Sequence, residues 1–361
     1  MLILMKIFLF ISIFLQSITY YFDPPQARVM VVGDIMMHSP IINSGYDSLT
    51  KEYNYDDIFE KVKPIFSQAD LVIGNLETPL AGEKIGYSGY PRFNSPDSLA
   101  SSLKNAGFDV LTTANNHSMD QWEQGVVGTL NALDSYNIFH TGTFRSEEES
   151  EENLIINVNG IKIGLIAYTY GTNGLPVPED KPYMVNLLDM DNISRDVNSL
   201  RSKGADYILA MIHYGDEYIR LPNQDQIYWT NEILASGVDF VLGSHPHVVQ
   251  PLLLLNDNKQ TTDKGAIYSL GNFLSDQRWD WKDYGIILDL LIEKNYWTGK
   301  MILKDVSAIP LYVDISTVDG KRKYVVLPLK DNISEVDKKV WDNGMELMEH
   351  VFNNGGIVIN D

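Results

Sequence analysis

Residues 29–34 read VMVVGD, a short apolar run that ends in a glycine and a carboxylate. Four apolar residues in a row, bounded by a turn signal, are typical of a buried β-strand. Similar runs recur along the chain, with amphipathic stretches of helical length between them. This alternation predicts strands joined by crossover helices, and therefore an α/β fold. Further strands are expected at 71–73, 110–113, 163–168, 208–212 and 240–242, and helices at 57–69, 98–106, 121–136, 193–203 and 224–236.

The sequence after residue 265 changes to strand-like runs that follow one another closely. We expect strands at 266–270, 286–293, 300–313 and 323–329, and a last helix at 335–352. Strand-rich sequence after alternating units predicts a second sheet packed against the first, with helices outside both. The expected organisation is one layered domain over residues 27–330, with a C-terminal helix and tail, residues 331–361, packed on it.

The composition limits the chemistry. The 361 residues include 28 Lys and Arg against 48 Asp and Glu, which gives a net charge of −20. This charge argues against a nonspecific grip on nucleic-acid phosphates, so we expect no nucleic-acid partner. The chain has no cysteine, which excludes disulfides, thiolate nucleophiles, thiolate zinc sites and iron–sulfur clusters. Any catalysis must therefore use oxygen and imidazole groups.

The first 22 residues predict export from the cytoplasm. Lys6 is followed by a run that is apolar except for four polar residues. The run is closer to the core of a signal peptide than to a full membrane span, which needs about 20 apolar residues. The segment fits either a cleaved signal peptide or an uncleaved N-terminal membrane anchor, and the alternative is a buried helix. We therefore expect an exported protein of the cell envelope, either secreted or held at the membrane by this segment.

Polar residues of metal-ligand type stand where several predicted strands end. In open α/β sheets, ligands bind beyond the carboxyl ends of the strands, so these residues can converge on one crevice. Each motif alone is an ordinary turn or helix cap, but independent caps would not be expected at so many corresponding strand ends. Carboxylate, amide and imidazole groups suit Mn, Fe, Zn or Mg, and four imidazoles disfavour calcium. The candidate ligands and their neighbour are Asp34, Glu77, Asn116, His117, His213, His245 and His247.

The His245-Pro246-His247 segment is the most specific of these motifs. In an extended His-x-His, side chains two residues apart point the same way, so both imidazoles could face one metal pair. Glycines close to the candidate ligands, Gly33 and Gly243 among them, are expected to let the backbone turn sharply. His38, His140 and His350 do not follow predicted strands, and we expect them to be structural or surface residues.

Six motifs occur in a fixed order along the chain. They are Gly33-Asp34-Ile35-Met36, Gly74-Asn75-Leu76-Glu77, Asn115-Asn116-His117, His213-Tyr214-Gly215-Asp216-Glu217-Tyr218, Gly243-Ser244-His245-Pro246-His247 and Ser269-Leu270-Gly271-Asn272-Phe273. Together they resemble the bacterial capsule synthesis protein family, CapA, which is associated with poly-gamma-glutamate. The resemblance covers roughly residues 28–329. It implies a calcineurin-like metallophosphoesterase fold, a four-layer αββα sandwich with a site for two divalent ions at its strand ends.

This sequence departs from the standard metallophosphoesterase pattern at three places. Ile35-Met36 stands where those enzymes have a His two residues after the first Asp. Their Gly-Asp-x-x-Asp block appears here as Gly74-Asn75-Leu76-Glu77, and the acid expected after Asn-His is Ser118. Glu77 is a candidate for the bridging carboxylate, and Asp120 for the missing acid. The number of metal ions is therefore open.

The resemblance implies a role for each matching residue. Asp34, Glu77, Asn116, His213, His245 and His247 would hold the metal. His117 would protonate the leaving group or stabilise the transition state. Glu217 is a further candidate catalytic residue, and its alternative is a solvated helix start. The expected substrate-binding residues are Arg92, Tyr218 and Asn272. Arg92 lies in residues 78–96, which like residues 171–183 form a long predicted loop rich in Gly, Pro and Tyr, a frequent kind of binding element.

Three functions remain after this reading. The first is a metal-dependent hydrolase or transferase of the cell envelope that acts on a phosphoester or glutamyl polymer during capsule production. The second is a non-catalytic scaffold that handles the polymer for a membrane polyglutamate synthetase. The third is a glycosidase with Glu77 and Glu217 as paired acids, which leaves four histidines unexplained.

Overall fold

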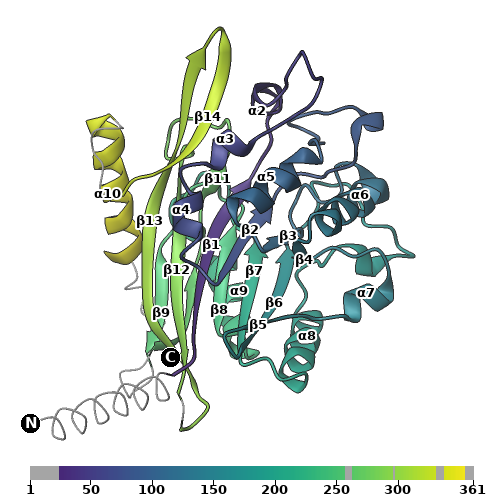
Figure 1. Ribbon diagram of the computed structural model, residues 1–361. Coiled ribbons are helices and arrows are strands. Elements are labelled where there is room, and N and C mark those ends of the chain that lie inside the picture. Colours follow the sequence, from purple (N-terminus) through teal and green to yellow (C-terminus); the bar gives the residue numbers. More distant parts are fainter. Residues whose placement is uncertain (1–23, 257–261, 296, 331–336, 354–361) are drawn as a thin grey trace, which may run out of the picture.

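The computed structural model describes residues 24–256, 262–295, 297–330 and 337–353 and contains two β-sheets packed face to face (Figure 1). The first sheet has the strand order β14-β13-β12-β1-β2-β3-β4, with β11 beside β1, and the second has the order β5-β6-β7-β8-β10-β9. The first sheet contains β1 (Gln26–Ile35), β2 (Leu71–Leu76), β3 (Val110–Thr112), β4 (Phe139–Thr141), β11 (Asn272–Leu274), β12 (Tyr284–Lys294), β13 (Met301–Val318) and β14 (Lys321–Pro328). The second contains β5 (Leu154–Val158), β6 (Ile161–Thr169), β7 (Tyr207–His213), β8 (Phe240–Ser244), β9 (Leu252–Asn256) and β10 (Thr262–Ile267).

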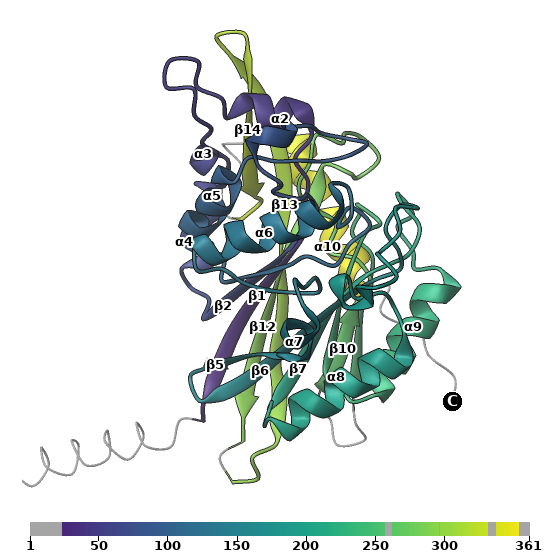
Figure 2. The same cartoon turned by 90° about the vertical axis from the view of Figure 1, so that its right-hand side faces the viewer.

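Helices cover the outer face of each sheet, and Figure 2 shows them on opposite sides of the molecule. The helices over the first sheet are α2 (Ser39–Ser44), α3 (Asp56–Phe59), α4 (Lys63–Phe66), α5 (Ser98–Ala106) and α6 (Trp122–Ser135). Those over the second are α8 (Met190–Ser202) and α9 (Gln224–Ala235), while α7 (Glu147–Glu151), η1 (Glu83–Ile85) and η2 (Pro182–Met184) lie in connections. The predicted four-layer αββα architecture is confirmed.

The strand periodicity explains how β1 serves two cores at once. Because successive side chains of a strand point to opposite faces, Val29 and Val31 pack between the sheets. Met30 and Val32 pack under the helices of the first sheet. All four side chains are fully buried, which explains why the run VMVV is continuously apolar instead of alternating.

The C-terminal strands correct one expectation. They were expected to form the second sheet, but β12 pairs antiparallel with β1, and β13 and β14 extend the first sheet beyond it. The second sheet instead begins with β5, and β9 and β10 join it beside β8. Each of these strands is apolar enough for either sheet, so composition alone does not show which sheet a strand joins. Helix α10 (Lys338–Asn353) contacts β13 (Figure 1), and its Leu347 and Val351 enter the core between the sheets.

The helix expected at 57–69 is two short helices, α3 and α4. Pro64 is the second residue of α4, and proline lacks the N–H that a continuous helix would need at that position. The elements α2, β4, α7, β5, β9 and β11 have no counterpart in the sequence predictions. They are short, with three to six residues each, and a periodic pattern needs a longer run than this to be recognised.

Residues 1–22, on which the export prediction rests, lie outside the described residues. Within the part of the chain that is described, no helix has the length and apolar character needed to cross a membrane.

The parallel strands place the candidate ligands. β1, β2 and β3 run parallel to one another in the first sheet, as do β6, β7 and β8 in the second. Their carboxyl ends therefore lie along one edge of each sheet. Since the two sheets are packed face to face, residues from both edges can meet.

Candidate metal centre

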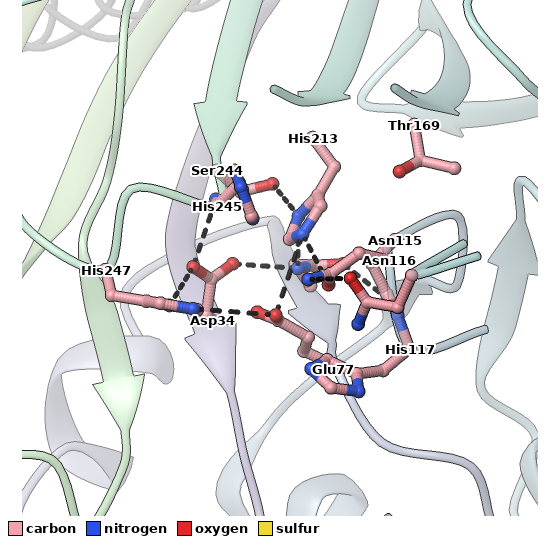
Figure 3. Close-up of polar contacts among 12 residues, drawn as sticks. Asp34, Glu77, Asn115, Asn116, His117, Thr169, His213, Ser244, His245 and His247 are labelled. Atoms are coloured by element: carbon pink, nitrogen blue, oxygen red, sulfur yellow. Dashed lines mark hydrogen bonds and ion pairs between the residues drawn. The ribbon is translucent and has the colours of Figure 1, made fainter. Parts of the chain in front are cut away.

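Side chains from the strand ends of both sheets form one buried cluster (Figure 3). Asp34 belongs to β1 and Glu77 follows β2, while His213 ends β7 and His245 and His247 follow β8. Potential ligand atoms lie within 4.8 Å of one another in two overlapping groups that share Glu77. One group is Glu77, His213 and His245, and the other is Asp34, Glu77 and His247.

Glu77 lies between these two groups and is fully buried. Its Oε1 is 3.6 Å from Nε2 of His213 and 3.8 Å from Nε2 of His247, as the dashed lines in Figure 3 show. Neither carboxylate oxygen has a hydrogen-bond partner. Burial, with the nearby charge of Asp34, raises the pKa of Glu77 well above its ordinary value. A buried carboxyl group without donors is unfavourable, and a divalent cation between the two groups would satisfy it.

Two histidines of the cluster, His213 and His245, are held in the form that binds metals. Burial and the neighbouring imidazoles lower the pKa of His213 well below its ordinary value. Burial also lowers the pKa of His245 to about 3. Both rings are therefore neutral near pH 7, and neutral imidazole is the ligand form.

Asn116 faces His213 from the first sheet. Its Oδ1 lies 3.0 Å from Nε2 of His213, while Nδ1 of the same ring lies 2.9 Å from Oγ of Ser244. If the ring donates Nδ1–H to Ser244, Nε2 of His213 and Oδ1 of Asn116 each present a lone pair on the same side. A cation beside both atoms would bind both. The unpartnered Glu77 oxygens fit the donor set to a metal ion.

The His245-Pro246-His247 segment is not extended, contrary to the expectation from its spacing. His245 has φ 98° and His247 has φ 57°, so both lie in the left-handed region. Their rings nevertheless lie close together, with centroids 5.9 Å apart. The N–H of His245 donates to Oδ2 of Asp34 at 3.2 Å. Strained backbone of this kind is found where the surrounding structure holds functional groups in place.

Two glycines are required for close packing and not for a sharp turn, which corrects the predicted reason for them. A Cβ atom on Gly33 would lie 1.9 Å from the carbonyl oxygen of Gly271. A Cβ atom on Gly243 would lie 1.9 Å from the carbonyl oxygen of Tyr268. Neither glycine is among the residues with positive φ. Both let a neighbouring chain segment approach the strand that carries the ligands.

Asn272 contacts the side-chain cluster from inside the protein. It is the register partner of Asp34 in the β1–β11 pair, and its Oδ1 lies 3.1 Å from Nδ1 of His247. Its Nδ2 donates to Oε1 of Gln277 and to the backbone oxygen of Lys282. The side chain is fully buried and all of its polar atoms have protein partners, so the geometry places it against His247 and away from any open surface.

His117, Arg92 and Asp120 lie together beside the cluster. Nδ1 of His117 is 2.8 Å from Oδ2 of Asp120, which also accepts the N–H of Phe93 at 2.7 Å. The Arg92 guanidinium donates to the backbone oxygen of Asp120. A cavity of about 330 Å³ opens here, between both long predicted loops and the candidate site. It is lined by Tyr90, Pro91, Arg92, Asn116, His117, Asp120, Asn173, Leu175 and Glu217.

Glu217 and Tyr218 lie at the exposed side of the two histidines. A carboxylate oxygen of Glu217 lies within 4.8 Å of ligand atoms of both His245 and His247. The Tyr218 ring centroid is 6.0 Å from that of His247. Burial, with the nearby charge of Glu217, raises the pKa of Tyr218 above its ordinary value. Both predicted residues therefore lie next to the cluster.

Sequence reasoning missed three residues that support the cluster. Asn75 donates to Oδ1 of Asp34 at 2.8 Å, and Ser244 contacts His213. The Tyr170 ring centroid lies 4.7 Å from that of His245. Asn75 and Ser244 stand inside motifs that were quoted without a role for them. Tyr170 directly follows β6, so a search for polar residues at the carboxyl ends of strands could have found it.

The remaining histidines lie outside the cluster. His38 accepts the N–H of Asp276 at Nδ1, and burial lowers its pKa to about 4. His140 pairs with Asp134 at 3.1 Å. Nε2 of His350 lies 2.9 Å from the backbone oxygen of Arg220.

Comparison with known proteins agrees with the sequence motifs. Relatives include the PGA biosynthesis protein CapA of Bacillus subtilis (strain 168), which is 30% identical over 273 residues. That match covers 73% of this chain and 67% of the relative. The capsule biosynthesis protein CapA of Bacillus anthracis is 28% identical over 258 residues, which are 69% of this chain and 60% of that protein.

Solved structures with similar folds are more distant. The calcineurin-like phosphoesterase YfkN from Bacillus subtilis has 15% identity and a TM-score of 0.47, over 91% of this chain and 97% of that one. A 5'-nucleotidase precursor from Thermus thermophilus has 12% identity and a TM-score of 0.45, over 90% of this chain and 58% of that one. Both TM-scores are below 0.5, so the four-layer architecture rests on the sheets of this chain.

The family model of the bacterial capsule synthesis protein PGA_cap matches residues 28–277, which include every cluster residue described above. The chain belongs to the bacterial capsule synthesis protein family PGA_cap.

Proposed function

We propose that this protein is a metal-dependent hydrolase or transferase that acts on a glutamyl polymer or a phosphoester in capsule production. The observation that carries the proposal is Glu77, a fully buried carboxyl group whose two oxygens lack hydrogen-bond partners. Its Oε1 lies 3.6 Å from Nε2 of His213 and 3.8 Å from Nε2 of His247. A purely structural residue at this place would be expected to have donors for both oxygens.

The proposed ligands divide between two divalent ions, of Mn, Fe, Zn or Mg. Bound there, the ions would supply Lewis acidity toward substrate oxygens. The ligands are Asp34, Glu77, Asn116, His213, His245 and His247. Asn272, assigned to substrate from the sequence, is better suited to orient His247 through their 3.1 Å contact, because partners of this kind fix the ring of a metal ligand.

The cavity beside the cluster is the proposed substrate site. With Nδ1 of His117 facing Asp120, Nε2 is the ring nitrogen left to protonate a leaving group. Arg92 is fixed by the backbone oxygen of Asp120 and offers a cation to a carboxylate or phosphate of the substrate. The half-exposed ring of Tyr218 offers a contact surface beside His247.

Elemental analysis of the purified protein, combined with assays on phosphodiesters and glutamyl peptides, tests this proposal. Wild-type protein should hold divalent metal in a fixed ratio to the chain and turn over at least one of these substrates. The variant His247→Ala should lose both properties. His140→Ala is the matched control, because His140 lies outside the cluster and pairs with Asp134. A stable wild-type protein with neither metal nor activity would contradict the proposal.

The second candidate is a non-catalytic scaffold that presents the polymer to a membrane polyglutamate synthetase. The observation in its favour is the pair of departures Met36 and Asn75, which remove a His and an Asp from the metallophosphoesterase pattern. A scaffold should bind poly-gamma-glutamate equally well with and without a chelator. Calorimetric titration of the polymer into the protein, with and without chelator, separates the two candidates. The enzyme should bind the polymer more weakly once the metal is removed, and the scaffold should not.

We also propose that residues 1–22 direct export of the protein to the cell envelope, where it is either secreted or anchored in the membrane. Protease added to intact cells should then digest the chain, and a version without residues 1–22 should be protected. Recovery of the full-length chain from the membrane fraction would indicate the anchored form, and a shortened chain in the medium the cleaved one.

A further inference from the structure

The proposed ligands are unequally divided between the two halves of the centre. One half has four ligands: Glu77, Asn116, His213 and His245. The other half has three, Asp34, Glu77 and His247. Met36 stands where the metallophosphoesterase pattern has a His, two residues after the first Asp. A thioether is a soft ligand and a poor substitute for imidazole at Mn, Zn or Mg.

We propose that Glu217 is the fourth protein ligand of this second half, an inference that rests on the metal centre proposed above. Oxygen and nitrogen atoms of Glu217, His245 and His247 lie within 4.8 Å of one another. The Glu217 carboxylate is close to both histidines. We assign it to the ion at His247 because the half that contains His245 already has four ligands. In this assignment, the carboxylate of Glu217 takes the place of the His that is absent at Met36.

The backbone fixes Glu217 at this position. The N–H of Tyr218, the next residue, donates to the carbonyl oxygen of Pro246 at 2.7 Å. Tyr218 has φ 67°, in the left-handed region, which is unfavourable for a tyrosine and indicates a loop held by its surroundings. Because Pro246 separates the two histidines, this hydrogen bond ties the Glu217 loop directly to the ligand segment.

Further contacts hold the residues that follow Tyr218. Gln250 donates through Nε2 to the backbone oxygen of Ile219 at 2.8 Å. The Arg220 guanidinium lies 4.0 Å from the centroid of the Trp281 ring, and its NH1 lies 3.7 Å from Oε1 of Glu346 in α10. The loop is therefore anchored at the three residues that follow Glu217, although the Glu217 side chain itself is exposed.

An unsatisfied group inside the cluster supports the metal centre on which this inference rests. His245 is 4% exposed, and its Nδ1 has no hydrogen-bond partner. Together with the two Glu77 oxygens, it leaves three buried polar atoms unpartnered among the residues that would surround the ions. Buried polar atoms without partners are expected where an ion would bind them.

Metal titration of the full-length protein tests the inference, with Mn²⁺ and Zn²⁺ as separate probes. Wild-type protein should bind two ions per chain by calorimetry and elemental analysis. Glu217→Gln should lose one of the two, or bind it at least about tenfold more weakly, and should change the Mn²⁺ electron paramagnetic resonance spectrum. Glu217→Asp should recover part of the affinity. Asp216→Asn is the matched control, since this exposed neighbour contacts Asn223 and should change neither ion.

The outcomes separate this inference from the proposed function. If Glu217→Gln keeps both ions at wild-type affinity while Glu77→Gln loses them, the metal centre stands and the role of Glu217 is wrong. If the wild-type protein binds no ion at all, both are wrong. Since Glu217 is exposed, the chelated Glu217→Gln variant should melt at the wild-type temperature, which excludes misfolding as the cause of a lost site.

Discussion

The carboxylate of Asp120 lies 2.8 Å from Nδ1 of His117, and both side chains are buried. Asp120 comes three residues after His117, whereas metallophosphoesterases place the acid directly after it. Ser118 occupies that place and instead accepts the N–H of Asn115 at Oγ and donates to the backbone oxygen of Thr113. The local turn therefore uses Ser118, and Asp120 orients the imidazole.

Replacing Asp120 tests this orientation. In Asp120→Asn, the side chain can place an N–H against Nδ1 of His117, so the ring should change tautomer. The ¹⁵N chemical shifts of His117 should report the change, and turnover should fall by about 10²-fold. Metal content should stay at the wild-type level because Asp120 is not among the proposed ligands. An unchanged tautomer with unchanged turnover would show that Asp120 serves only the backbone of Phe93.

The contact between Asn272 and His247 gives a prediction about metal affinity. Asn272→Ala removes the side chain 3.1 Å from Nδ1 of His247, so the ring loses part of its orientation. Affinity for Mn²⁺ or Zn²⁺ should fall by about 10- to 100-fold, as for other partners of metal ligands. Competition with a chelating dye measures the affinity. Gln277→Ala, which removes only a partner of Asn272, should have a smaller effect, and equal losses in both variants would argue against a specific role for Asn272.

Two glycine substitutions test the close packing behind the ligands. Gly33→Ala would bring a Cβ atom to 1.9 Å from a backbone oxygen, which no rotamer change can relieve. The free energy of unfolding should fall by about 3 kcal/mol or more. Gly171→Ala is the matched control, since no atom lies within 4 Å of the added Cβ. Denaturant unfolding of the two chelated variants compares them, and equal stability would contradict the packing argument.

The stability of the metal-free protein should depend on pH through its buried histidines. The unfolded chain takes up protons at His213 and His245 near pH 6.5, the ordinary pKa of histidine. The folded protein resists protonation, with a pKa of about 3 for His245. Their contribution to stability is therefore present above pH 6.5 and is lost as the pH falls from 6.5 toward 3.

Glu77 acts in the opposite direction. Because burial raises its pKa above 4.5, its contribution is present below pH 4.5 and is lost as the pH rises. Between pH 4.5 and 6.5 the two histidines outweigh the single carboxyl group, so acid should destabilise the protein. In His213→Asn the dependence should become shallower by up to about 1.4 kcal/mol per pH unit. Ser244→Ala should lower stability at every pH and keep the wild-type slope, and a wild-type slope in His213→Asn would refute this account.

The sequence by itself determined the α/β class, most of the long strands and helices, and the candidate ligands that the structure brings together. Apolar runs such as 29–32 fold as buried strands in any packing arrangement, because backbone geometry and burial act locally. Ligands bind beyond the carboxyl ends of parallel strands, and these ends lie along one edge of a sheet. This rule selects Asp34, Glu77 and the three clustered histidines.

Only the tertiary structure decided which strands share a sheet and how the ligands face one another. The pairing of β12 with β1 depends on contacts between segments more than 250 residues apart, and no local pattern encodes such a partner. The same holds for the left-handed backbone of His245 and His247 and for the hydrogen bond from Tyr218 to Pro246. These features arise from the packing of loops from both sheets, which periodicity and spacing do not specify.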